Sequence, residues 1–275
     1  MITFVYAIGG TDINYYNSLI QSLISLAEVI KYPYKVVIIS DINLHSWECN
    51  ESYRYYGKTL SANAGKHEFW RMRYDLLSHI DTEYVMYLDV DTVFVNDNIS
   101  SIIEKIGDSF GICQHFWVPT ILSYYEKAMP KDDITREMFR KLNITKNYEY
   151  FASGAFIFKN NATNAALIKE VQNTYNAIYG DSHEYLEGFT DEFWLAYSIW
   201  KTNTKVCKLS GAFNHCAEPP MLLRDNDGIL EGSNPQKEDW APVTLFHCAT
   251  NKRVPGWQYD QDLAKKVKEC FPNIL

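Results

Sequence analysis

The hydrophobic and polar positions along the chain alternate between short apolar runs and longer stretches with helical spacing. Residues 2–8, ITFVYAI, form an apolar run that Gly9 and Gly10 end. Residues 14–30 then carry apolar side chains three or four positions apart, and residues 35–39, KVVII, form a second run. This pattern predicts a strand, an amphipathic helix and a second strand. Such a βαβ unit favours a parallel sheet with right-handed connections.

The alternation continues along the chain. Residues 66–81 have the core-face spacing of a helix, and residues 84–90 follow as a third apolar run. Further strands are predicted at residues 110–115, 154–158, 205–209 and 244–248, and further helices at 164–179, 190–200 and 261–270. Residues 211–243 lack periodicity and are rich in turn-forming residues, which favours a long loop. Without a repeat or a low-complexity linker, the pattern predicts one α/β domain.

Composition narrows the classes of function. The chain has 275 residues and a formal net charge of −8, whereas a general nucleic-acid binder needs a basic surface. No apolar stretch approaches the ~20 residues of a membrane span. The first predicted strand begins at Ile2, which leaves no room for a signal peptide. The six cysteines form no CxxC pair. We therefore predict a cytoplasmic protein with reduced thiols.

Two aspartates, Asp89 and Asp91, follow the apolar run at residues 84–88, YVMYL. Side chains at i and i+2 of a strand point to the same side. Both carboxylates can therefore reach one point beyond the carboxyl end of the strand, where open α/β sheets bind ligands. Two like charges that close need a positive charge between them. A hard divalent cation that also binds a diphosphate meets this need, and a solvated turn is the alternative.

Other charged positions are candidates for the same site. Arg73 falls on the apolar stripe of the predicted helix, where a charge needs a partner. That partner is either a carboxylate such as Asp89 or a ligand phosphate. His247 ends a predicted strand and is either a third metal ligand or a structural residue. Lys252 lies in the basic turn that follows, where it can clamp phosphate oxygens.

Asp191 and Glu192 open the predicted helix at 190–200, directly behind Thr190. Threonine is a good N-cap, and acidic residues in a first helical turn interact favourably with the helix dipole. The functional alternative is a carboxylate that faces a reacting carbon. Both interpretations stay open at this point.

Together these motifs resemble those of retaining glycosyltransferases with the GT-A fold, which move a sugar from a nucleotide-diphosphate donor. Residues 86–92, MYLDVDT, resemble the D-x-D strand of glycosyltransferase family eight, which includes glycogenin, galactinol synthase and lipopolysaccharide galactosyltransferases. Arg73 matches the donor-binding Lys/Arg of that family, and residues 150–155, YFASGA, are similar to its Y-F-N-x-G-V segment. His247 with Lys252 and Trp257 resembles its H-x-G-x-x-K-P-W ending, with wider spacing.

Two positions depart from family eight. Ala152 stands where that family has Asn, and Glu192 where it usually has Gln. Both changes resemble glycosyltransferase family six, the blood-group A/B and α1,3-galactosyltransferases. That family also has a D-V-D-x-V-F strand like residues 89–94 and an A-I-G start like residues 7–9.

The resemblance implies an α/β, Rossmann-like GT-A fold with a mostly parallel central sheet flanked by helices. It implies metal-dependent, retaining transfer of a hexose from a donor of the UDP-glucose or UDP-galactose type to a glycan or other hydroxyl acceptor. Residues 1–115 would form the nucleotide-binding half and residues 116–275 the acceptor- and sugar-binding half. The implied roles are Mn²⁺ or Mg²⁺ binding by Asp89, Asp91 and His247, donor binding by Ala7, Gly9, Arg73, Ser153 and Lys252, and catalysis by Asp191 and Glu192.

Two other classes fit part of the pattern. A haloacid dehalogenase-type phosphatase also has D-x-D after an apolar strand, but usually near the N-terminus, and no later lysine and paired-acid motif is evident. A non-catalytic nucleotide-sugar-binding module would share the same binding residues.

Lys265, Lys266 and Lys268 form a small basic cluster in the predicted helix at residues 261–270. A solvated helix face and a peripheral membrane contact are both open interpretations of this cluster.

Overall fold

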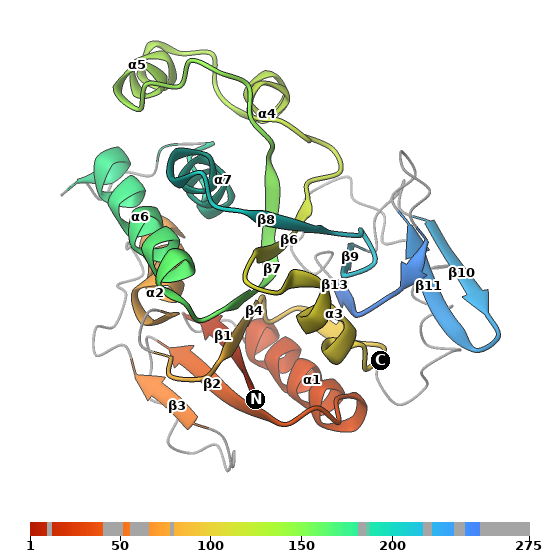
Figure 1. The fold of residues 1–275 in the computed structure, drawn as a ribbon. Helices are drawn as coiled ribbons and strands as arrows, with labels where there is room; N and C mark the ends of the chain where they lie inside the picture. Colours follow the sequence, from red (N-terminus) through yellow and green to blue (C-terminus); the bar gives the residue numbers. More distant parts are fainter. Residues whose placement is uncertain are drawn as a thin grey trace.

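A seven-stranded sheet forms the centre of the molecule (Figure 1). The computed structural model describes residues 1–9, 13–40, 52–55, 66–77, 80–180, 186, 188–216, 222–233 and 240–247. Within them the strand order is β3-β2-β1-β4-β7-β6-β8. The strands are β1 Ile2–Ile8, β2 Tyr34–Ser40, β3 Ser52–Tyr55, β4 Tyr84–Leu88, β6 Phe110–Gln114, β7 Phe151–Lys159 and β8 Val206–Leu209. Only β7 is antiparallel to its neighbours among these strands. The prediction of a mostly parallel sheet is confirmed.

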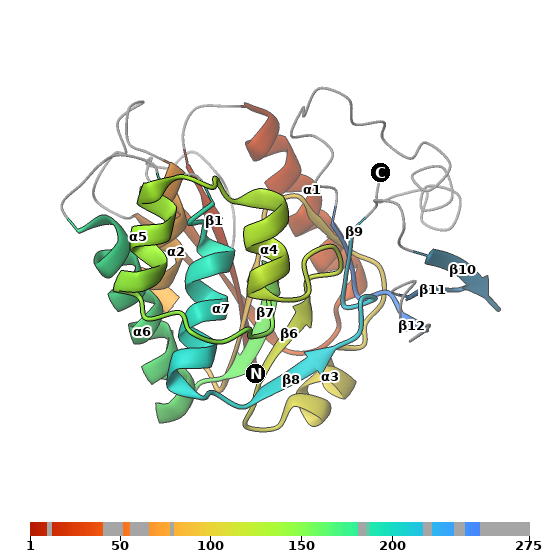
Figure 2. The ribbon, with the colours of Figure 1, turned by 90° about the horizontal axis from the view of Figure 1, so that it is seen from above.

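Helices cover both faces of this sheet, as Figure 2 shows. On one face lie α1 Ile13–Val29 and α3 Ile99–Ile106, whose buried residues join a core with β1 and β4. On the other face lie α2 Lys66–Leu77, α6 Ala162–Tyr179 and α7 Asp191–Thr202, which bury a second and more aromatic core. The sheet is apolar on both faces because helices exclude water from both. The prediction of a helix-flanked α/β fold is therefore confirmed.

The predicted elements that fall within the described residues all have counterparts. The helix predicted at residues 66–81 ends at Leu77, and the strand predicted at 84–90 ends at Leu88, before Asp89. The predicted helix at 261–270 lies outside the described residues, as do Lys252 and the basic cluster of Lys265, Lys266 and Lys268. None of the described helices is both long enough and apolar enough to cross a bilayer.

Residues 211–243 were expected to form a loop, and that expectation is wrong for much of the segment. β9 Asn214–Cys216 joins β5 Thr92–Phe94 and β13 Leu245–His247 in one three-stranded sheet, and β10 Leu222–Asn226, β11 Ile229–Ser233 and β12 Ala241–Pro242 form another. Asp227 and Gly228 both have positive φ and form the two-residue hairpin turn between β10 and β11. The strand predicted at residues 244–248 is β13. The other strands of these two sheets, β5, β9, β10, β11 and β12, escaped the periodicity analysis because each has two to five residues.

Two helices between β6 and β7 were also not predicted. They are α4 Ile121–Ala128 and α5 Asp133–Lys141, each only two turns long. Side-chain caps start both: Thr120 accepts a hydrogen bond from the Ser123 backbone N–H, and Asp132 from that of Thr135. Two turns give too few apolar positions to establish a period.

The three-stranded sheet that carries β13 contains a buried histidine, His215. His215 is fully buried on β9, stacked on Phe246 with ring centroids 5.9 Å apart. Burial lowers the pKa of His215 from 6.5 to about 4, although the carbonyl of Leu222 near Nε2 opposes this shift. The unfolded chain therefore binds a proton between pH 6.5 and about 4 that the folded chain does not.

We expect the free energy of unfolding to fall as the pH drops from 6.5 toward 4, with about 3 kcal/mol of that loss due to His215. Urea unfolding at pH 7.5 and pH 4.5 measures it. The His215→Phe variant keeps the ring stack and removes the titration, so it should lose less stability over this interval. An equal loss in both proteins would show that His215 does not contribute.

Candidate active site

A sharp turn after β4 places the two aspartates. The Asp89 backbone N–H donates to the carbonyl of Gly154 at 2.8 Å, and Thr92 Oγ1 donates to the carbonyl of Asp89 at 2.8 Å. The turn leads into β5, which runs antiparallel to β13 so that Thr92 pairs with His247. This pairing brings His247 beside Asp91 although 156 positions separate them in the chain.

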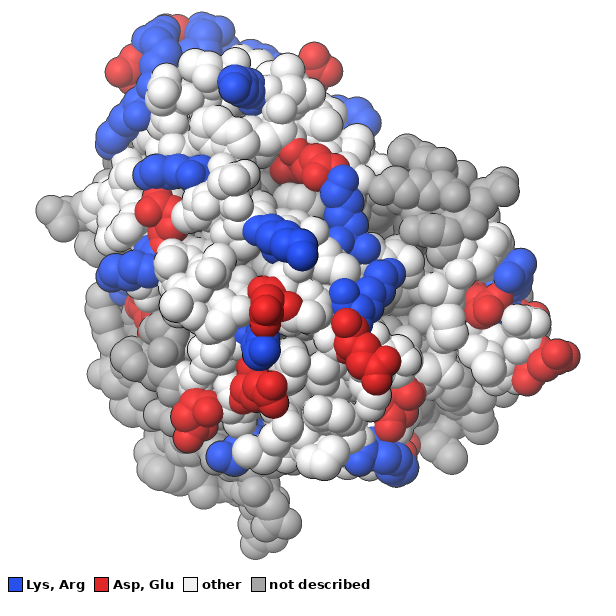
Figure 3. All heavy atoms as spheres, viewed as in Figure 1, with Lys and Arg blue, Asp and Glu red and all other residues white. Residues whose placement is uncertain are grey.

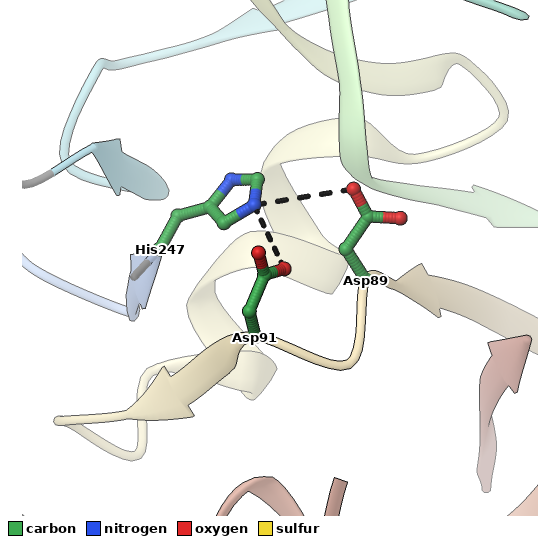
Figure 4. A group of neighbouring side chains, drawn as sticks. All are labelled: Asp89, Asp91 and His247. Carbon is green, nitrogen blue, oxygen red and sulfur yellow. Dashed lines mark hydrogen bonds and ion pairs between the residues drawn. The ribbon is translucent and has the colours of Figure 1, made fainter. Parts of the chain in front are cut away.

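The three side chains point toward one another (Figure 4). His247 Nε2 lies 3.1 Å from Asp91 Oδ1 and 3.9 Å from Asp89 Oδ2, and one ligand atom from each residue lies within 4.8 Å of the others. Asp91 and His247 are buried and Asp89 is half-buried. Two carboxylates and one imidazole are oxygen and nitrogen donors that suit a divalent ion such as Mn²⁺ or Mg²⁺. The donor set therefore fits the cation that the sequence predicts.

Gly154 leaves the space in which these residues meet. A Cβ atom at this position would lie 2.5 Å from His247 Cε1 and 3.1 Å from Asp89 Oδ2. β7 also bulges here, because residues 152–155 lie opposite a single residue of β6. Bulges next to a site re-aim the chain. The sequence contained Gly154 within the YFASGA motif but gave no reason for a glycine at that point.

We expect Gly154→Ala to weaken Mn²⁺ binding by about tenfold or more, because the added methyl group displaces His247 or Asp89. Isothermal titration of Mn²⁺ into the folded protein measures it. Gly111→Ala is the matched control: its Cβ would meet Ile106 and Ile157 in the core. That variant should lower the thermal midpoint and leave Mn²⁺ affinity unchanged. Equal Mn²⁺ affinities for wild type and Gly154→Ala would contradict this account of Gly154.

Arg73 supplies a buried positive charge behind the aspartates. Its side chain, on α2, is 3% exposed, with Nη1 3.1 Å from Asp191 Oδ2 and 3.6 Å from Asp89 Oδ1. Burial alone would lower the pKa of Arg73, but the attraction of Asp191 and Asp89 outweighs it and raises the pKa above its ordinary value. The sequence indicated that this arginine needs a partner, and the structure gives it two carboxylates.

Tyr87 is a further contributor that the sequence analysis did not identify. Its hydroxyl donates to Asp89 Oδ1 at 2.9 Å, and the Arg73 guanidinium lies over its ring at 4.6 Å from the centroid. Burial raises the pKa of Tyr87 well above its ordinary value, so the phenol stays protonated and donates. The signal for Tyr87 was available, because it lies two positions before Asp89 on the same face of β4.

A second pair of carboxylates begins α7. Ser153 holds both: its Oγ donates to Asp191 Oδ2 at 2.5 Å, and its backbone N–H donates to Glu192 Oε1 at 3.3 Å. Burial raises the pKa of Glu192 to about 8, with further increases from Asp191 and Asp89 and a partly opposing effect of the Ser153 N–H. Thr190 occupies the N-cap position as predicted, but its side chain makes no capping hydrogen bond.

The structure brings most of the predicted site residues to one edge of the sheet. Ala7 and Gly9 lie at the end of β1, which pairs with β4 through Tyr6 and Leu88. The residues linked by the contacts above are Arg73, Asp89, Asp91, Ser153, Asp191, Glu192 and His247. Lys252 lies outside the described residues. In the described part of the chain, neither Cys113 nor Cys207 forms a disulfide.

Known structures resemble this arrangement of elements. Galactosyltransferase LgtC in complex with donor and acceptor sugar analogs has a TM-score of 0.55 and 16% identity, covering 98% of this chain and 94% of that one. Mouse xyloside xylosyltransferase 1 has a TM-score of 0.55 and 10% identity, covering 92% and 99%. The bifunctional glycosyltransferase WbbM has a TM-score of 0.56 and 14% identity, covering 90% of this chain but 45% of that one.

This chain has the GT-A glycosyltransferase fold. The resemblance stated from the sequence is confirmed at the level of this fold. Searches with the sequence itself found no matching family model and no matching curated protein. At identities of 10% to 16%, the GT-A fold is what the chain shares with these proteins. The GT-A fold also differs from that of the haloacid dehalogenase-type phosphatases considered above.

Proposed function

We propose that the protein is a metal-dependent, retaining glycosyltransferase that moves a hexose from a nucleotide-diphosphate sugar to a hydroxyl acceptor. One observation carries this proposal: Asp89, Asp91 and His247 form a divalent-ion donor set beside the buried Arg73 and the Asp191–Glu192 pair. A GT-A fold that places these groups at the carboxyl edge of its sheet supports it, as do neighbours that are galactosyl- and xylosyltransferases.

The net negative charge of the protein indicates that an anionic donor would be held by individual positive groups at the site. The chain has a net charge of −8, and Lys and Arg are interspersed with Asp and Glu on the face in Figure 3. An anionic diphosphate would thus be held by charges at the site rather than by a broad basic surface. Asp89, Asp91 and His247 would hold Mn²⁺ or Mg²⁺, which supplies positive charge next to the leaving diphosphate. Lys252 would bind the diphosphate as well.

The other residues of the site would orient Asp89 and bind the donor and the acceptor. Arg73 and Tyr87 fix the orientation of Asp89 through one oxygen, which leaves the other for the cation. Ala7 and Gly9 would border the uridine of a UDP-glucose- or UDP-galactose-type donor. We propose that residues 1–115 bind the nucleotide and residues 116–275 the sugar and acceptor, within one domain.

Glu192 would face the anomeric carbon. The Ser153 N–H fixes its Oε1, and Asp191 is held next to it by Ser153 Oγ and Arg73. In the ionised form Glu192 can act as a transient nucleophile, as carboxylates do in retaining glycosidases. It can also stabilise an oxocarbenium-like state electrostatically while the acceptor attacks from the donor face. Both roles require the ionised carboxylate.

A screen of UDP- and GDP-sugars with the purified protein tests the proposed function. We expect hydrolysis of at least one UDP-hexose in the presence of Mn²⁺, none with EDTA, and faster nucleotide release when an acceptor glycan is added. Metal-dependent binding of a nucleotide sugar without turnover would identify a non-catalytic binding module instead. Hydrolysis of a generic phosphomonoester, without nucleotide affinity, would contradict the proposal.

A further inference from the structure

The loop after β6 displays a tryptophan to solvent at the edge of the sheet that carries the site. Trp117 is 46% exposed, whereas Trp70, Trp194, Trp200 and Trp240 are buried or half-buried in the described part of the chain. β4 and β6 both run antiparallel to β7, so their carboxyl ends lie at one edge. Trp117 lies three residues after the end of β6 at Gln114, and thus on the side of the sheet where Asp89 follows β4.

Hydrogen bonds fix the backbone of the loop at Trp117. His115 Nδ1 accepts hydrogen bonds from the backbone N–H groups of Trp117 and Val118 at 3.3 and 3.4 Å. Lys127 Nζ donates to the carbonyl of Trp117 at 2.7 Å. Phe116 packs edge-on against Trp117 with ring centroids 5.5 Å apart. An exposed indole on a fixed backbone loses less conformational entropy when a ligand covers it than an indole on a mobile loop does.

The first residues of β7 connect this loop to the candidate active site in a definite order. The Gly154 carbonyl accepts a hydrogen bond from the Asp89 N–H, and a Cβ at Gly154 would meet His247, while Ser153 binds both Asp191 and Glu192. The carbonyl of Tyr150 accepts a hydrogen bond from the His115 backbone N–H at 2.9 Å. Four residues of chain span at most roughly 14 Å. The order along β7 is therefore metal ligands, catalytic carboxylates and then the aromatic loop.

That order matches the order of groups in glycosyl transfer: diphosphate, anomeric carbon, acceptor. We propose that Trp117, backed by Phe116, is the platform on which the apolar face of an acceptor pyranose ring stacks. Indole combines a large apolar face with an N–H that can donate to a sugar hydroxyl. The ligand class is a neutral hexopyranoside or a short glycan ending in one. This inference rests on the proposed function for its role in transfer, but sugar binding can be measured without it.

The experiment uses the full chain and a panel of methyl β-galactoside, methyl β-glucoside, methyl β-N-acetylglucosaminide and lactose. Saturation-transfer NMR measures binding of each glycan without donor. Transfer assays with Mn²⁺ and the UDP-sugar found by the screen measure the Michaelis constants of acceptor and donor. The variants are Trp117→Ala, Trp117→Phe and the control Ile24→Ala, which changes an exposed apolar side chain on α1.

We expect Trp117→Ala to weaken binding of the best glycan and raise its KM about tenfold, with the donor KM changed by less than roughly twofold. Trp117→Phe should restore most of the affinity, and Ile24→Ala should match wild type. If wild type binds glycans through Trp117 but never turns over a donor, the proposed function fails and the platform stands. If Trp117→Ala binds and uses glycans as wild type does, or if wild type binds none of the panel, the platform is refuted.

Discussion

Asp91→Ala is expected to abolish most metal-dependent transfer, with a fall in kcat of about a hundredfold to a thousandfold. The substitution removes one of the three proposed metal ligands and also the carboxylate 3.1 Å from His247 Nε2. Two remaining donors would bind Mn²⁺ weakly, so excess Mn²⁺ should recover only part of the rate. Donor turnover measured across a series of Mn²⁺ concentrations gives both quantities.

Asp133→Ala is the matched control for Asp91→Ala. Asp133 lies on α5 and is 95% exposed, where its ion pair with Arg136 contributes little. The control makes the same change in net charge and should leave both kcat and the Mn²⁺ dependence unchanged. An Asp91→Ala enzyme with wild-type turnover would place the metal elsewhere or remove it from the mechanism.

Glu192→Gln is expected to lower kcat by about a hundredfold or more, with the KM for the donor little changed. Glutamine keeps the size of the side chain and an oxygen for the Ser153 N–H, but it cannot ionise. Near wild-type turnover in this variant would exclude both the nucleophile and the electrostatic role. Steady-state kinetics with the preferred donor measure the difference.

The pH dependence gives a second test of Glu192. Its pKa is raised to about 8 in the protein without metal, so the ionised fraction grows as the pH rises toward that value. A bound cation favours the ionised form and moves this rise to lower pH. The ratio of wild-type to Glu192→Gln rates should therefore increase with pH and then level off. A ratio independent of pH between 5 and 9 would contradict a role for the carboxylate.

The raised pKa of Glu192 also affects the stability of the folded state. A carboxyl group whose folded pKa lies above its unfolded value weakens the folded state as the pH rises from 4.5 toward 8, because the unfolded chain ionises first. In EDTA at pH 8, Glu192→Gln should thus be at least as thermally stable as wild type. This result would show that the loss of turnover is not a loss of folding.

Long apolar runs made the central part of the fold predictable. β1, β2 and β4 each bury successive residues between helices on both faces, and such runs stand out in sequence. The Asp89–Asp91 pair could be placed at the edge of the sheet because it follows an apolar strand. The turn after Leu88, and not the alternation of a strand, sets the directions of the two carboxylates. Of the strands in the two small sheets, β13 was predicted at residues 244–248. The others have two to five residues, which is too short to give a recognisable apolar run or alternation.

The candidate site could be predicted only in part, because its geometry depends on contacts between segments that are distant in the sequence. The residues themselves left open whether His247 binds metal, and only the family resemblance joined it to Asp89 and Asp91. The pairing of β5 with β13 is what brings it there. Arg73 showed its need for a partner through its place on an apolar stripe, but its contact with Asp191 depends on how α2 and α7 sit on the sheet. Gly154 carries no local signal, since its need for a glycine comes from His247.

Anomalous diffraction at the manganese edge, from crystals soaked with UDP and MnCl₂, tests the central claim most directly. We predict one strong peak coordinated by Asp89, Asp91 and His247, with the diphosphate of UDP on its open side. The same soak of the Asp91→Ala variant should lose most of that peak. A wild-type map in which the three side chains hold no ion, and the two carboxylates face solvent beside a bound nucleotide, would contradict it.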